Sequence, residues 1–111
     1  MSDCLFCKIV AGDVPSDKVY EDEKILVFRD IAPKAEVHLL LIPKEHIESL
    51  NELSALEDSV VLHMMQQLPL LAAMAGIGDG YRTIINTGQR GGQVVFHLHI
   101  HLMGGGKLPG F

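Results

Sequence analysis

Gln93-Val94-Val95-Phe96-His97-Leu98-His99-Ile100-His101-Leu102-Met103 is the most informative stretch of this sequence. Successive side chains of a β-strand point to opposite faces, so a strand over Gln93–Met103 would have two different faces. One face would carry the apolar residues Val94, Phe96, Leu98, Ile100 and Leu102, and the other His97, His99 and His101. A solvent-facing strand would carry Lys, Glu or Thr as readily as histidine, so the pattern favours a functional cluster of imidazoles.

The rest of the chain alternates between strand-like and helix-like patterns. The predicted strands are Val19–Tyr20, Lys24–Arg29, His38–Ile42, Tyr81–Asn86 and Gln93–Met103. The first two should form a hairpin, and His38–Ile42, which ends before Pro43, should be buried on both faces. Thr87–Gly92 is glycine-rich and should be the hairpin loop between the last two strands.

The main helix should begin at Ser54, because Ser54-x-x-Glu57 has the form of a capping box. Its apolar face would consist of Leu56, Val60, Met64, Leu68, Leu71, Ala72 and Ala75. Pro69 should kink or split this helix, and Gly76 and Gly78 should end it. Val61 and Met65 widen the apolar face. The wider face would either form a homodimer contact or belong to the core. We expect a single α+β domain over residues 1–111, with an antiparallel sheet, this helix and a short helix.

Composition and charge exclude some functions. A net charge of −5 argues against nucleic-acid binding, which depends on clustered lysine and arginine. The N-terminal residues contain no basic segment followed by an apolar stretch, so we expect no secretory signal and a cytoplasmic protein. The most apolar window, Leu68–Ala75, is shorter than the roughly 20 residues of a spanning helix, so no membrane segment is expected.

The histidine cluster has two chemical interpretations. His-x-His on a strand can chelate zinc together with a third ligand. Alternatively, one neutral imidazole can attack phosphorus while its neighbours stabilise charge and move a proton, and a pKa of about 6.5 suits both tasks. The catalytic interpretation is favoured. Cys4-x-x-Cys7 has the spacing of zinc ligands, and a metal or redox role is favoured over a disulfide in a reducing compartment. The remaining alternative is that Cys4 and Cys7 are buried or free thiols without a ligand.

The motif His97-Leu98-His99-Ile100-His101-Leu102-Met103 resembles the signature of the histidine triad nucleotide-binding (HIT) family, in which three histidines alternate with apolar residues. The resemblance extends over nearly the whole chain. It includes Phe28–Pro33, His38–Lys44, Asn86, Gly91-Gly92-Gln93 and Met103-Gly104-Gly105.

The resemblance implies that His99 attacks the α-phosphorus and forms a nucleotidyl-histidine that water hydrolyses. His101 would contact the phosphate oxygens, and His97 and His38 would help to transfer the proton. Asn86 would hold the phosphate or His101, and Gly92 would let backbone amides approach the phosphate. A purine pocket is implied for Phe6, Ile9, Val14, Phe28, Ile31 and Leu40, with Asp30 accepting hydrogen bonds from the ribose.

Members that share Cys-x-x-Cys and Pro-Lys-x-His bind structural zinc, which here implies Cys4, Cys7, His46 and His97 as ligands. His97 would then not be a free proton donor, and proton delivery would pass to His38 or His101. His63 is expected at the surface or in an interface without a catalytic task.

Two departures from the family pattern concern the substrate. Val94 replaces a polar residue that in relatives can assist the leaving group, and the chain ends at Gly110-Phe111, so loose selectivity is expected. The resemblance implies a purine nucleoside phosphoramidate or nucleotide hydrolase that binds purine nucleoside monophosphates. The alternatives are a dinucleoside polyphosphate hydrolase or nucleotidyl transferase, and a non-catalytic nucleotide-binding or scaffolding protein.

Overall fold

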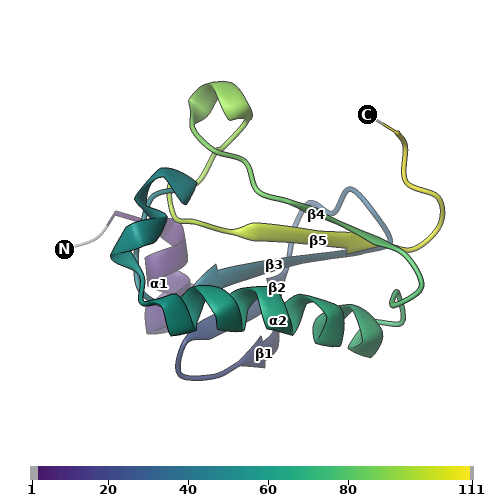
Figure 1. Cartoon of the computed structure of the whole chain (residues 1–111), viewed down its shortest axis with the longest axis horizontal. Helices are drawn as coiled ribbons and strands as arrows, with labels where there is room; N and C mark the ends of the chain where they lie inside the picture. The colour runs from purple at the N-terminus through teal and green to yellow at the C-terminus, as the bar shows by residue number, and fades with distance from the viewer. Residues whose placement is uncertain (1–2, 111) are drawn as a thin grey trace.

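β3 (Val37–Pro43) lies in the middle of a five-stranded antiparallel sheet with the strand order β1-β2-β3-β5-β4 (Figure 1). The computed structural model describes residues 3–110. The other strands are β1 (Lys18–Glu21), β2 (Ile25–Arg29), β4 (Tyr81–Ile84) and β5 (Ile100–Gly104). The helices are α1 (Leu5–Ala11), α2 (Asp58–Met74) and two 3₁₀ helices, η1 (Leu50–Ala55) and η2 (Gln89–Gly91). The expected α+β class with an antiparallel sheet is confirmed.

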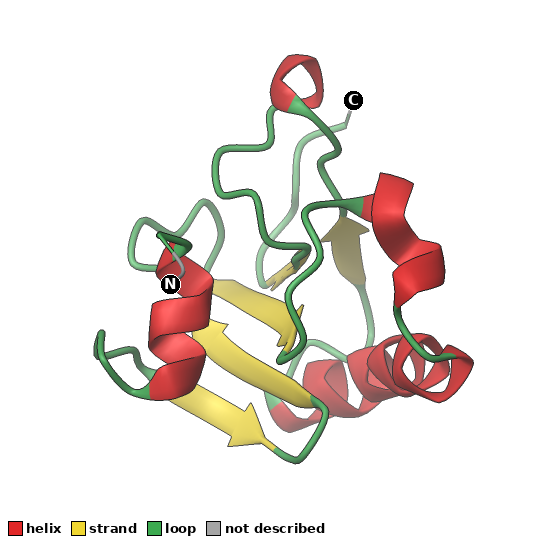
Figure 2. Cartoon of the chain, turned by 90° about the vertical axis from the view of Figure 1, so that its left-hand side faces the viewer, coloured by secondary structure: helices red, strands yellow, loops and turns green. Residues whose placement is uncertain are grey.

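The two helices cover opposite faces of the sheet, and the alternation of side chains along β2 and β3 provides both cores (Figure 2). Residues 25, 27, 39 and 41 pack on the side of α2, where Leu68 and Leu71 join them. Residues 26, 28, 40 and 42 pack on the side of α1 with Phe6 and Ile9. β3 is therefore buried on both faces, as predicted.

The prediction that Ser54 opens the main helix is wrong. Ser49 Oγ instead accepts a hydrogen bond from Asn51 N (3.1 Å) and starts η1, which contains Ser54. The chain becomes extended at Leu56, and α2 begins at Asp58 without a side-chain cap. A local capping motif was thus overridden by the turn that buries Leu56 against the core.

Pro69 does not split α2, which continues to Met74. The proline is exposed, and so is Met65, whose carbonyl loses its helical donor. Water can therefore solvate that carbonyl, while Leu68 and Leu71 anchor the helix on the other side. Gly76, with a φ of +79°, follows the end of the helix as predicted. Val61 packs against the core, whereas Met65 is 51% exposed.

The predicted strand Gln93–Met103 is wrong in its first half, because β5 begins only at Ile100. β4 also ends early, at Ile84, so residues 85–99 form a long connection instead of a short hairpin loop. The Gln93 side chain accepts from Gly88 N (2.8 Å) and donates to the Glu48 carbonyl (2.6 Å), which holds this segment away from the sheet. As a result Val94 is 85% exposed, whereas Leu98 is buried as predicted.

None of the helices in the described part of the chain is long and apolar enough to cross a membrane. Phe111, on which the expectation of loose selectivity partly rested, lies outside the described residues, as do Met1 and Ser2.

Candidate active site and metal centre

His99 is held in one orientation by a hydrogen bond from its ring to the backbone. Its Nδ1 lies 2.7 Å from the backbone carbonyl oxygen of His97. A carbonyl can only accept, so Nδ1 carries the proton and Nε2 carries a lone pair. The ring is buried (7% exposed) and packs edge-to-face on Phe6, with the centroids 5.1 Å apart. This orientation is what an imidazole nucleophile requires.

His38 and His101 form a hydrogen-bonded relay beside His99. Lys34 N donates to His38 Nδ1 (3.1 Å), so neutral His38 must carry its proton on Nε2. That nitrogen donates to His101 Nδ1 (2.9 Å), and neutral His101 therefore carries an N–H at Nε2. Asp30 Oδ2 lies 3.5 Å from His38 Nε2.

The relay is uncharged at neutral pH. Burial lowers the pKa of His38. Burial, and then the neighbouring His99 and His38, lower the pKa of His101 to about 4. Desolvation penalises the charged imidazolium, so both rings are neutral, in agreement with the hydrogen-bond directions.

A cavity of about 530 Å³ lies over this group, within the size range of small-molecule pockets. It is lined by every residue for which nucleotide contact was predicted, namely Phe6, Ile9, Val14, Phe28, Asp30, Ile31, Leu40, Asn86, Gly92, His99 and His101. His38 also lines it, whereas Ile31 is 97% exposed and lies at the rim. The sequence did not indicate that Leu5, Lys34 and Val95 line the cavity, because only the fold brings them to it.

Asn86 and Gly92 shape the turn next to the cavity. Asn86 Nδ2 donates to the Gly91 carbonyl (2.9 Å), so the amide braces the turn. Gly92 has a φ of +87°, a backbone conformation that residues with a Cβ atom rarely adopt. The glycine is therefore required by the backbone here. The Gly92 amide itself donates to the Gln89 carbonyl (3.0 Å) within the turn.

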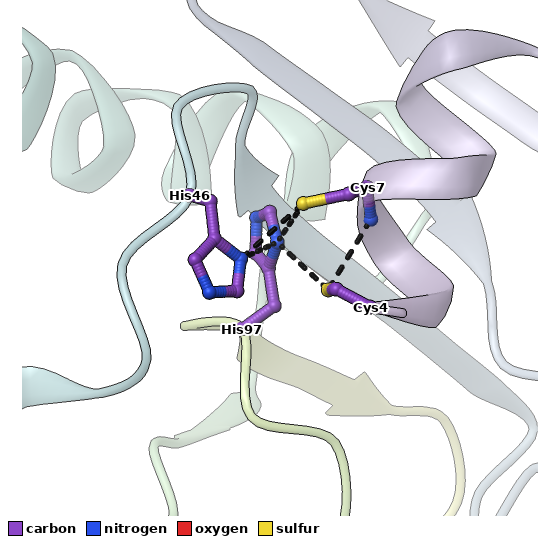
Figure 3. A group of neighbouring side chains, drawn as sticks. All are labelled: Cys4, Cys7, His46 and His97. Carbon is purple, nitrogen blue, oxygen red and sulfur yellow. Dashed lines mark hydrogen bonds between the residues drawn. The ribbon is translucent and has the colours of Figure 1, made fainter. Parts of the chain in front are cut away.

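His97 belongs to a second cluster, formed with Cys4, Cys7 and His46 (Figure 3). His97 is fully buried, and its Nε2 lies 2.8 Å from the Pro43 carbonyl oxygen. Nε2 therefore donates, and the lone pair is on Nδ1, which points at the other three residues. A carbonyl that orients a histidine in this way is a common feature of metal sites.

The four donor atoms have the spacing of a tetrahedral site. His97 Nδ1 lies 3.2 Å from His46 Nδ1 and 3.4 Å from Cys4 Sγ. Cys7 Sγ lies 3.3 Å from His46 Nδ1 and 3.5 Å from His97 Nδ1. Zinc bonds of about 2.0–2.3 Å give tetrahedral edges of roughly 3.3–3.8 Å, so the donor set fits this ion. The cluster can bind a metal ion.

The structure therefore separates the three histidines of the motif. His99 and His101 line the cavity, whereas His97 does not. Phe6 on α1 contacts the rings of both His97 and His99, with centroid distances of 6.0 and 5.1 Å. The Cys/His cluster and the cavity thus share one aromatic wall.

His63 lies away from both sites, on α2. Its Nε2 is 2.6 Å from Asp22 Oδ2, in the turn between β1 and β2. Burial opposes ionisation of Asp22, but hydrogen bonds from His63, the Lys24 amide and Tyr20 outweigh it and lower the pKa of this carboxyl. His63 therefore connects α2 to the turn between β1 and β2.

The fold and the two clusters define a class: a small α+β protein with three cavity-lining histidines and a separate Cys/His cluster. The chain belongs to the HIT domain family, whose sequence model matches residues 11–108. It is 49% identical over 106 residues to an uncharacterised HIT-like protein of Synechococcus elongatus, covering 96% of this chain and 93% of that one.

Two further relatives are described as enzymes. The chain is 43% identical over 105 residues to the purine nucleoside phosphoramidase of Escherichia coli, covering 94% of this chain and 88% of the relative. The solved structure of a HIT family hydrolase from Clostridium thermocellum superposes with a TM-score of 0.90 at 40% identity, over 100% of this chain and 97% of that one.

Proposed function

We propose that this protein hydrolyses purine nucleoside phosphoramidates through a nucleotidyl intermediate on His99. The observation that carries the proposal is the bond from His99 Nδ1 to the His97 carbonyl, which leaves the Nε2 lone pair beside a nucleotide-sized cavity. The Escherichia coli relative, named a purine nucleoside phosphoramidase, supports the substrate class.

In the first half-reaction His99 Nε2 forms a bond to the α-phosphorus, and the bond from phosphorus to the leaving nitrogen breaks. His101 Nε2–H contacts the phosphoryl group and gives its proton to that nitrogen, and a proton from solvent replaces it at Nε2, so that His101 and its partner His38 both stay neutral. The proton taken from solvent balances the positive charge on nucleotidyl-His99.

In the second half-reaction water attacks the same phosphorus. It returns one proton to solvent, and the bond to His99 Nε2 breaks. Nucleoside monophosphate is released, and His38 and His101 have the same protonation as at the start. No part of this cycle requires His97, whose Nδ1 faces the Cys/His cluster.

The nucleoside would lie along the apolar side of the cavity, with the purine against Phe6 and Phe28, whose rings contact each other edge-to-face with centroids 5.4 Å apart. Asp30 Oδ1 accepts from Ala32 N (2.8 Å), which orients the carboxylate. Asp30 Oδ2 can then accept from ribose hydroxyls at the rim. This placement leaves the turn at Gly92 for the phosphate.

Three further features belong to the proposal. Cys4, Cys7, His46 and His97 hold structural zinc, on the basis of the donor spacing given above. Two chains form a homodimer through the exposed apolar side of α2. The protein works in the cytoplasm, where a reducing environment keeps both thiols available as ligands.

The test is incubation with adenosine 5′-phosphoramidate, followed by chromatography of AMP and mass spectrometry of the protein. Wild type should release AMP and carry an adenylyl-histidine on rapid quenching. His99→Ala should lose at least about a thousandfold in kcat/KM yet still bind AMP, because losing a nucleophile removes covalent catalysis. His63→Gln is the matched histidine control and should keep its activity. Nucleotide binding without turnover or adduct would reject the hydrolase and leave a nucleotide-binding protein.

A further inference from the structure

The loop between β2 and β3 brings an unpaired positive charge to the nucleotide-sized cavity. Of the described residues that line this cavity, Arg29 and Lys34 are the only arginine and lysine. The Arg29 guanidinium pairs with Asp17, with Nη1 3.2 Å from Oδ1. In the described part of the chain no carboxylate lies within ion-pair distance of the Lys34 ammonium. The charge of Lys34 is therefore available to a ligand.

Lys34 lies next to the neutral histidine pair. Its backbone N–H donates to His38 Nδ1 (3.1 Å), and His38 Nε2 donates to His101 Nδ1 (2.9 Å). Burial is the largest cause of the lowered pKa of both histidines, and the Lys34 ammonium lowers each pKa further, whereas Asp30 raises it. Coulomb interactions weaken with distance, so the ammonium lies close enough to act on this pair.

The other groups beside the reacting nitrogen offer a phosphate no formal positive charge. His38 and His101 are neutral, as their hydrogen-bond directions require. The amides of Gly91, Gly92 and Gln93 already donate to carbonyls of their own turn. A nucleoside monophosphate carries nearly two negative charges at neutral pH, and desolvating that charge is unfavourable unless a cation compensates it.

The position of the phosphoryl group follows from the proposed chemistry. Phosphorus must lie against His99 Nε2, and its oxygens must lie beside the His101 ring, whose centroid is 5.0 Å from that of His99. His101 is also the ring to which His38 and the Lys34 loop are hydrogen-bonded. Lysine has a flexible four-carbon stem, so its ammonium can turn toward oxygens that lie beside this ring.

We propose that the Lys34 ammonium binds the 5′-phosphoryl oxygens of the substrate and gives the cavity its preference for nucleotides over uncharged nucleosides. The inference rests on the proposed function, because that function places phosphorus beside His99. It assigns Lys34 a contact through charge alone. Arginine can therefore replace Lys34 in part, whereas glutamine, which has no charge, cannot.

The experiment measures the Kd of AMP and of adenosine by calorimetry. Lys34→Gln should bind AMP about fivefold or more weakly, while its affinity for adenosine stays within about twofold of wild type, because only the charge interaction is lost. Added sodium chloride should weaken AMP binding to wild type more than to Lys34→Gln. Lys34→Arg should keep most of the AMP affinity. Lys24→Gln, an exposed change in the turn between β1 and β2, is the control and should bind both ligands like wild type.

The outcomes separate this contact from the hydrolase itself. Unchanged AMP affinity in Lys34→Gln, or an equal loss for AMP and adenosine, would overturn the contact. With adenosine 5′-phosphoramidate, Lys34→Gln should raise KM about fivefold and leave kcat nearly unchanged, as expected for a contact made equally in the ground state and the transition state. Wild type that shows no turnover but keeps the AMP-specific loss in Lys34→Gln would reject the hydrolase and retain the contact.

Discussion

At the residue scale, His101 shows how position changes the chemistry of an ordinary side chain. A histidine in water titrates near 6.5, but burial, and then the neighbouring His99 and His38, lower the pKa of His101 to about 4. The ring can therefore act as a hydrogen-bond donor in a fixed tautomer at neutral pH. The motif alone does not specify this state, because Lys34 N and His38, which impose it, come from another strand and its preceding loop.

This lowered pKa has a consequence for stability. The unfolded chain binds a proton at His101 near pH 6.5 and the folded chain only near pH 4, so wild type loses stability as the pH falls through that window. The variant His101→Asn should lose less stability over the same range of pH. Urea unfolding at pH 7.5 and pH 5 should show a smaller decrease in the variant, by on the order of 2 kcal/mol. Equal decreases in the two proteins would show that His101 is not neutral in the folded state.

At the scale of elements, α1 links the Cys/His cluster to the cavity. With seven residues it is too short to be a stable helix by itself, so tertiary contacts must hold it. Cys4 and Cys7 lie at its start, where Cys4 Sγ accepts from Cys7 N (3.3 Å). Phe6 and Ile9, on the same helix, line the cavity. Loss of a metal should therefore also disturb nucleotide binding.

The zinc proposal predicts about one ion per chain by elemental mass spectrometry in protein purified without added metal. Cys4→Ser should lose the ion, melt at lower temperature and bind AMP at least about tenfold more weakly, because α1 is released. Lys8→Gln, an exposed change on the same helix, should alter none of these quantities. Metal-free wild type with the same melting temperature and AMP affinity would refute the proposal.

At the scale of the whole molecule, α2 presents one side to the core and leaves apolar side chains on the other. Leu62 is 58% exposed, Met65 51%, Leu70 60% and Met74 64%. β4, at the end of the strand order, leaves one edge of the sheet unpaired among the described strands. Exposed apolar groups of this extent favour association with a second copy.

The homodimer proposal predicts a mass of two chains by light scattering at micromolar concentration. Leu62→Lys combined with Met65→Lys should give a monomer, since two charges would have to be buried. Glu57→Lys, a change of charge just before α2, is the control and should remain dimeric. A monomeric wild type at these concentrations would contradict the proposal.

The sequence by itself determined the fold class, because the apolar runs at residues 25–28 and 39–42 and the helical spacing of Met64, Leu68 and Leu71 are local patterns. Through the family resemblance, which covers nearly the whole chain, it also named many of the residues that line the cavity, although not Leu5, Lys34 or Val95. The catalytic and binding roles of those residues stay predictions.

Only the tertiary structure decided where β5 begins, where α2 begins, and how the three motif histidines divide. Gln93 holds its segment away from the sheet through Glu48, far away in the sequence. Likewise His97 faces Cys4 and Cys7 because its other nitrogen bonds to Pro43. Contacts between residues distant in the chain set these directions, and no spacing within the motif contains them.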